Sequence, residues 1–201
     1  MWSLDGTAKG PGPTLTPDLE STTGRLYPDP GMDYAVVQAG IDVVGRVVAE
    51  RPGLAVVEVD HPLRLGHAVT GIFQDGWAQP RSAYSQYETP GGRGGTIVVG
   101  VARLGCGNDT LRATAHVTVG RLVVGPDKQP AIGAVTAERA VPVACREQHE
   151  LKLPAPPPPF RVEVVVDPPF VPAEADPERS TDYRTLGAQV AYRFVPAGET
   201  P

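Results

Sequence analysis

The chain has 201 residues, a formal charge of -5 and a sequence pI near 5.4, and no stretch of it gathers lysine or arginine. Nucleic acid is therefore excluded as a partner, because phosphate binding needs clustered positive charge. No apolar run approaches the roughly 20 residues that a bilayer span requires. The 23 glycines and 23 prolines predict many turns and no long helix, because proline removes a backbone donor and clashes with the preceding turn.

The N-terminal region differs in composition from the rest of the chain. Residues 1–32 are rich in glycine and proline and show little periodicity, which predicts an arm or linker with at most one short strand. Within this arm, Trp2 is expected to pack against the body of the domain. A single β-sandwich domain is expected over residues 33–196, followed by a tail at residues 197–201.

The first strands of the domain are expected at residues 35–41, 43–49 and 54–59. A tight reversal at residues 50–53 joins the last two. The apolar residues of 33–50 also fit the 3.6-residue period of a helix. Gly40, Gly45 and the β-branched valines of that segment argue against a helix.

Further strands are expected at residues 67–73, 79–87, 97–101, 111–119, 121–124, 135–143, 160–167 and 186–194. Alternation is cleanest in 97–101 and 111–119, which predicts that these two segments form a half-buried antiparallel pair. Five of the six residues at 90–95 are glycine or proline, so the chain must turn there. Residues 153–159 predict a rigid polyproline spacer across one end of the sandwich; a proline-reading partner is the alternative.

Valine-rich and threonine-rich segments between turns at roughly 8 to 12 residue spacing are typical of two-sheet proteins. The fold class predicted is therefore all-β. Its expected architecture is a two-sheet antiparallel β-sandwich of the jelly-roll type, as in carbohydrate-binding modules, rather than a barrel.

The two cysteines, Cys106 and Cys145, each follow the end of an expected strand. A disulfide between them would close a loop of roughly 40 residues and contribute about 4 kcal/mol of stability. Two unrelated buried thiols are the alternative. A lasting disulfide implies an oxidising, extracytoplasmic location, yet no signal peptide is visible. We therefore expect this domain to be a piece of a longer, membrane-embedded protein.

The sequence contains no catalytic motif and predicts no cofactor. Its four histidines are His61, His67, His116 and His149. They lack the short spacings of zinc or copper ligands and are interpreted as surface or structural residues, while a structural calcium, which needs only scattered oxygen ligands, stays open. No nucleophile elbow and no phosphate-binding loop is present. Residues 108–110 match a glycosylation acceptor.

Aromatic and polar side chains of the kinds that bind carbohydrate gather in two places. They are Asp75, Trp77, Arg81, Tyr84 and Tyr87, together with Asp182 and Arg184 just ahead of the last strand. Sugar C–H faces stack on indole and phenol rings, while hydroxyl groups bond carboxylates and guanidinium groups. These seven residues are therefore the predicted carbohydrate-binding site, and none is assigned a catalytic role.

Each of these residues also has a structural interpretation. Trp77 and one of the tyrosines would serve as core anchors, since each large ring buries roughly 150–250 Å². Asp75 would be a turn residue whose carboxylate caps nearby backbone amides. Asp182 and Arg184 would form an ion pair that pins their loop to the sandwich.

Three segments of the sequence carry a family resemblance. They are Ile72-Phe73-Gln74-Asp75-Gly76-Trp77 with Tyr84 and a downstream Gly-Cys, the run from Leu153 to Val164, and Phe170-Val171-Pro172-Ala173-Glu174 followed by the run from Asp182 to Val190. Over about residues 35 to 195 the chain resembles the C-terminal extracytoplasmic domain that follows the membrane helices of polytopic cell-envelope glycosyltransferases in actinobacteria and their relatives. The resemblance implies a jelly-roll module that binds glycan or positions an acceptor, with the transfer chemistry in the membrane portion.

We therefore expect a noncatalytic, carbohydrate-binding-like domain. Its expected partners are a cell-envelope polysaccharide or lipid-linked glycan and the membrane portion of the parent protein. Two alternatives stay open: a structural or protein-interaction sandwich that braces a membrane protein, and a glycan-cleaving enzyme. The sequence names neither the sugar nor the linkage.

Overall fold

The computed structural model describes residues 18–199, except residues 21, 28, 30, 39, 105 and 107–111. Trp2, most of the expected N-terminal arm and the glycosylation acceptor at 108–110 lie outside the described residues. No helix in the described part is long and apolar enough to cross a bilayer.

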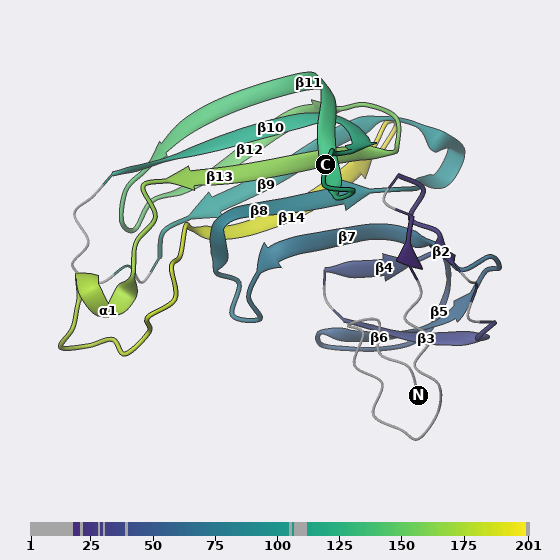
Figure 1. Cartoon of the computed structure of the whole chain (residues 1–201), viewed down its shortest axis with the longest axis horizontal. Helices are drawn as coiled ribbons and strands as arrows, with labels where there is room; N and C mark the ends of the chain where they lie inside the picture. The colour runs from purple at the N-terminus through teal and green to yellow at the C-terminus, as the bar shows by residue number, and fades with distance from the viewer. Residues whose placement is uncertain are drawn as a thin grey trace.

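The described chain is built almost entirely of strands (Figure 1). They are β1 (Asp18–Leu19), β2 (Leu26–Tyr27), β3 (Tyr34–Gln38), β4 (Ile41–Val43), β5 (Gly45–Arg51), β6 (Leu54–Val59), β7 (Leu65–Ile72), β8 (Ala78–Gln86), β9 (Gly95–Ala102), β10 (Ala113–Val124), β11 (Pro130–Val143), β12 (Gln148–Ala155), β13 (Phe160–Asp167) and β14 (Gln189–Pro196). The helical elements of this part are a 3-10 turn, η1 (Pro90–Gly92), and one turn of helix, α1 (Pro172–Ala175). The all-β prediction is confirmed, and the alternative of a helix over 33–50 is wrong because that segment forms β3, β4 and most of β5.

The strands form two main antiparallel sheets and two smaller ones. The large sheet has the order β11-β10-β13-β8-β7-β4, and the facing sheet has the order β12-β9-β14. A small sheet, β3-β6-β5, lies below the β4 and β7 end of the large sheet in Figure 1, and β1 pairs with β2. The large and facing sheets make the expected sandwich.

The first core fills the space between the large and facing sheets. Its central residues are Tyr84, Ile97, Val99, Val101, Val117, Val119, Phe160, Val162 and Val164. Burial alternates along β13, where Phe160, Val162 and Val164 are buried and their neighbours are more exposed. This alternation is the strand period that the sequence predicted.

A second core lies on the opposite face of the large sheet, between that sheet and the small sheet. Its residues include Leu26, Ala35, Val37, Val57, Val59, Leu63, Leu65, Tyr87 and Leu122. Adjacent residues of β7 pack against different cores: Ala68 against the second core and Val69 against the first. Leu26 and Met32 belong to the second core, so the packed domain begins before the boundary expected at residue 33.

The predicted pairing of residues 97–101 with residues 111–119 is wrong. β9 pairs with β12 and β14, whereas β10 pairs with β11 and β13. Both strands alternate because they face the first core from opposite sheets. Alternation identifies the buried face of a strand but not the neighbour with which the strand pairs.

The expected polyproline spacer is shorter than predicted. Leu153, Pro154 and Ala155 belong to β12 and pair with β9. Only residues 156–159 lie between β12 of the facing sheet and β13 of the large sheet. These four prolines therefore carry the chain across one end of the sandwich, as expected.

Three stacked rings link the large sheet to the facing sheet. His67 stacks on Tyr84 with 5.3 Å between ring centroids, and Tyr84 stacks on Tyr192 at 5.6 Å. Burial lowers the pKa of His67, although the Asp42 carboxylate, 3.8 Å away, opposes this shift. The folded protein therefore favours the neutral imidazole.

This preference predicts a loss of stability on acidification. A histidine whose folded pKa is below its unfolded value of about 6.5 stabilises the fold above that pH, and the contribution is lost as pH falls through the folded pKa. His67→Phe keeps a ring on Tyr84 without titrating, so urea unfolding at pH 7.5 and 5.5 should show a smaller difference than in the wild type. His116→Gln, on an exposed position of β10, is the control. An unchanged difference in His67→Phe would contradict the assignment.

Candidate functional site

The turn between β7 and β8 presents the first part of the candidate site. The Phe73 N–H donates to the Trp77 carbonyl at 2.7 Å, and the Gly76 N–H donates to the Phe73 carbonyl at 2.9 Å. Gly76 has a φ of +83°, a conformation that glycine adopts at low cost. Asp75 accepts a bond from the Trp77 N–H at 3.3 Å, so its carboxylate caps the turn.

The second part lies in the stretch between β13 and β14, which contains α1 and is otherwise irregular. Phe170 and Leu186 exchange backbone hydrogen bonds of 2.9 and 2.8 Å, which fixes the two ends of this segment together. Ala78 at the start of β8 donates to the Ala188 carbonyl at 2.8 Å. These bonds hold the segment against the β7–β8 turn.

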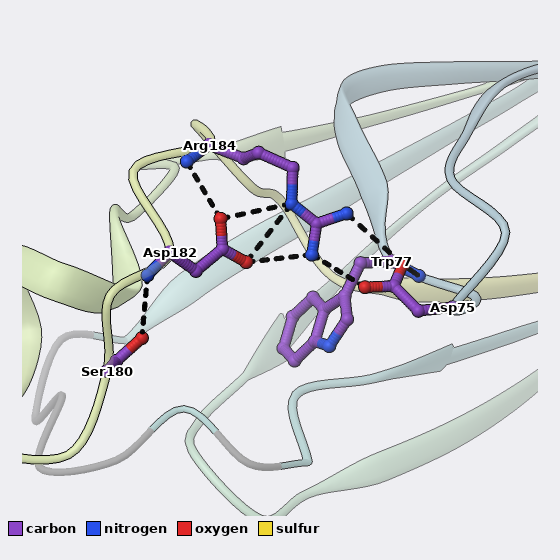
Figure 2. Close-up of polar contacts among 5 residues, drawn as sticks. All are labelled: Asp75, Trp77, Ser180, Asp182 and Arg184. Carbon is purple, nitrogen blue, oxygen red and sulfur yellow. Dashed lines mark hydrogen bonds and ion pairs between the residues drawn. The ribbon is translucent and has the colours of Figure 1, made fainter.

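Asp75, Asp182 and Arg184 form an ion-pair cluster, here called the arginine clasp (Figure 2). The Arg184 Nη2 lies 2.6 Å from Asp75 Oδ2 and 2.7 Å from Asp182 Oδ2, and its Nε lies 3.0 Å from Asp182 Oδ1. The Asp182 carboxylate also accepts the Arg184 backbone N–H at 2.9 Å, and Ser180 Oγ accepts the Asp182 N–H at 3.2 Å. The clasp joins two segments 109 residues apart.

The clasp carries a net negative charge at neutral pH. Hydrogen bonds from Arg184 hold the pKa of both Asp75 and Asp182 below the usual range. The Asp182 and Asp75 carboxylates in turn raise the pKa of Arg184 above its ordinary value. Two ionised carboxylates against one guanidinium leave a formal charge of -1. Because the side chains are part-exposed, solvent screens much of their attraction.

Aromatic rings lie beside the clasp. The Arg184 guanidinium carbon is 4.6 Å from the centroid of the Phe73 ring. Trp77 is half-buried and meets Phe170 edge-on, with 5.4 Å between centroids. Phe170 also lies 4.6 Å below the guanidinium of Arg103, which is fully buried.

The disulfide between Cys106 and Cys145 is confirmed, with a Cα–Cα distance of 5.8 Å. Both cysteines belong to a third hydrophobic cluster with Phe170, Leu186, Phe73 and Trp77. The covalent link is therefore packed against the rings that support the arginine clasp.

Three predicted site residues lie elsewhere. Arg81 is exposed on β8 and lies 3.9 Å from Glu163. Tyr84 is 4% exposed in the first core and Tyr87 is 7% exposed in the second. Rings buried to this extent offer no face to an external sugar, so both tyrosines are core anchors in this structure. Proximity to Trp77 in sequence was misleading because β8 leads away from the turn into the sandwich.

One surface residue was missed by sequence reasoning. Tyr183 lies between Asp182 and Arg184 in the chain and is 78% exposed. Its position between two predicted site residues, Asp182 and Arg184, could have identified it as a candidate from the sequence. Phe73 and Phe170 were also missed, because their roles depend on contacts between segments far apart in sequence.

Within the described residues, no group of three or more histidine, cysteine, aspartate or glutamate side chains is placed to hold a metal ion. No protein-family model, curated protein or solved structure matches the chain. The likeness to the extracytoplasmic domain of membrane glycosyltransferases therefore rests on the sequence motifs and stays a prediction.

Removal of the guanidinium should change the ionisation of the clasp. In Arg184→Met, the pKa values of Asp75 and Asp182 should rise toward the ordinary value of an aspartate, because each loses its principal hydrogen-bond donor and counter-charge. Carboxyl NMR titration measures both values. Arg179→Met, an exposed arginine in the same segment, should leave them unchanged. Equal pKa values in the wild type and Arg184→Met would contradict the clasp.

Removal of the disulfide should destabilise the whole fold. The bond joins residues 39 positions apart, so Cys106→Ala with Cys145→Ala should lower the free energy of unfolding by about 4 kcal/mol, mainly by releasing the unfolded chain. Urea unfolding under non-reducing conditions measures this loss. A loss below about 1 kcal/mol would show that the cross-link does not constrain the unfolded state.

Proposed function

We propose that this chain is a noncatalytic, extracytoplasmic carbohydrate-binding domain of a membrane glycosyltransferase, and that it holds a cell-envelope glycan at the arginine-clasp end. The observation that carries the proposal is Tyr183. A phenol ring 78% exposed, flanked in the chain by two members of the clasp, presents the combination of apolar face and polar groups that sugars bind. The half-buried Trp77 adds a second ring beside the clasp (Figure 2).

The electrostatics of the clasp support a binding role over glycan cleavage. A glycosidase acid must hold its proton near neutral pH, which requires a raised pKa. The pKa values of Asp75 and Asp182 are both lowered by Arg184. Both groups are therefore hydrogen-bond acceptors for sugar hydroxyls rather than proton donors.

The disulfide supports a location outside the cytoplasm, because such bonds persist in oxidising compartments. This location agrees with the resemblance of the sequence to a domain that follows membrane helices. The membrane portion of the parent protein would supply the transfer chemistry.

Titration with arabinan, galactan and mannan fragments tests the proposal. In a Trp2→Phe background, Trp77 is the one remaining tryptophan, so its fluorescence reports on the clasp end. At least one fragment should shift this fluorescence, and Tyr183→Ala should weaken its affinity by about tenfold through loss of the stacking ring.

Tyr34→Ala is the matched control, because Tyr34 is also an exposed tyrosine, 57% accessible, on the small sheet. It should bind the fragment as the wild type does. Absence of any response to the three glycans, or equal affinity of Tyr183→Ala and the wild type measured by calorimetry, would rule out glycan binding at this end.

A further inference from the structure

The β7–β8 turn contains a dipeptide that is prone to spontaneous chemical change. Asp75 is followed directly by Gly76. In an Asp-Gly pair the glycine nitrogen can attack the side-chain carboxyl carbon of the aspartate, because glycine has no side chain to obstruct the approach. The product is a succinimide ring, which water opens mainly to isoaspartate. The sequence of this turn therefore favours isomerisation.

The structure requires both residues of this dipeptide. Gly76 has a φ of +83°, a conformation that other residues adopt only at a cost. The Asp75 carboxylate accepts the Trp77 N–H and meets the Arg184 guanidinium. Replacement of either residue would therefore remove the susceptible pair but would also disturb the turn or the arginine clasp.

Isomerisation at this pair needs no reagent besides water. The Gly76 nitrogen loses its proton and bonds to Cγ of Asp75, while a carboxyl oxygen leaves Cγ as water. A second water molecule then breaks the original peptide bond between the two residues. The product has the same mass as the starting chain, a free α-carboxylate and one additional methylene group in the main chain.

Hydrogen bonds hold the two reacting groups in other directions. The Gly76 N–H donates to the Phe73 carbonyl at 2.9 Å, so the nitrogen is engaged with a different oxygen. Asp75 Oδ2 lies 2.6 Å from Arg184 Nη2, and Asp75 Oδ1 accepts the Trp77 N–H at 3.3 Å. Ring closure requires the carboxyl group to turn back toward its own peptide bond, and these bonds must break first.

The charge of Asp75 also opposes the reaction. An ionised carboxylate is a poor electrophile, since its oxygen leaves as water only when the group is protonated. Hydrogen bonds from Arg184 hold the pKa of Asp75 below its usual range, so the protonated form is scarcer at neutral pH. Burial offers little protection, because the Asp75 side chain is 48% exposed. What restrains this carboxyl group is therefore its contact with Arg184.

We propose that the arginine clasp protects Asp75-Gly76 from isomerisation to isoaspartate. Arg184 keeps the Asp75 carboxyl group away from the Gly76 nitrogen. The inference goes beyond glycan binding and does not depend on it. An isoaspartate would lengthen the turn by one methylene group and displace the carboxylate, so the cap on Trp77 and the contact with Arg184 would both be lost.

Ageing of the full chain tests the proposal. Wild type and Arg184→Met are incubated at neutral pH, at a temperature at which both stay folded, and sampled over several weeks. Trypsin then releases Asp75-Gly76 in the peptide 65–81 and a second pair, Asp5-Gly6, in the peptide 1–9. Electron-transfer mass spectrometry distinguishes isoaspartate from aspartate in each peptide. Isoaspartate at position 75 should form about tenfold faster in Arg184→Met, because a charge-assisted hydrogen bond no longer restrains the carboxyl group.

The second pair is the internal reference. Asp5 is not a member of the clasp, so the rate at position 75 is expressed relative to the rate at position 5. In concentrated urea, where the clasp is absent, position 75 should isomerise equally fast in both proteins and faster than in the folded wild type. A folded wild type that isomerises at position 75 as fast as the unfolded chain would contradict protection.

Two further variants separate the clasp from general stability. Arg179→Met removes an exposed arginine of the same segment. Val57→Ala weakens the second core without touching the clasp. Both should isomerise at position 75 as slowly as the wild type. Equal rates in the wild type and Arg184→Met, or an equal acceleration by Val57→Ala, would overturn the proposal.

Discussion

Alternation of side chains in the large sheet is the constraint on which the rest of the fold depends. Ala68 and Val69 are neighbours in β7, yet each supports a different core. A shift of one residue in this strand would exchange its two faces and leave both cores with the wrong side chains. The pairing of β7 with β8 becomes irregular between Thr70 and Ile72. Gly71 lies at this irregularity with a φ of +75°, and a Cβ there would collide with the carbonyl oxygen of Arg81.

Near the β7–β8 turn, hydrophobic packing and ion pairs hold the same two segments together. The third cluster places rings beneath the β7–β8 turn, and Arg184 fastens the segment before β14 to that turn. Most of the hydrogen-bonding capacity of this guanidinium is used by Asp75 and Asp182. Tyr183, between Asp182 and Arg184 in the chain, is by contrast 78% exposed.

The sequence predicted local properties of the fold well and long-range properties poorly. Alternation located the buried residues of the strands at 97–101, 113–119 and 160–166, and the two cysteines formed the expected bond. Strand order could not be predicted in this way, because the same alternation fits a strand in either sheet, as β9 and β10 demonstrate.

The predicted site residues do not all lie together in the fold, because neighbours in sequence need not be neighbours in space. Asp75 and Trp77 lie in a turn, whereas Tyr84 and Tyr87 lie beyond it in the sandwich, and only the folded chain shows that Asp75 meets Arg184.

The composition of the second core has a consequence for the order of events during synthesis. The small sheet is encoded near the N-terminus, so it leaves the ribosome early. Its core also requires Tyr87, which follows β8, and Leu122, near the end of β10. Until those later residues emerge, Val37 and Val57 lack part of their apolar surroundings, and apolar surface exposed in this way favours aggregation. The small sheet is in this way completed only after β8 and β10 have been made, although its own strands precede both.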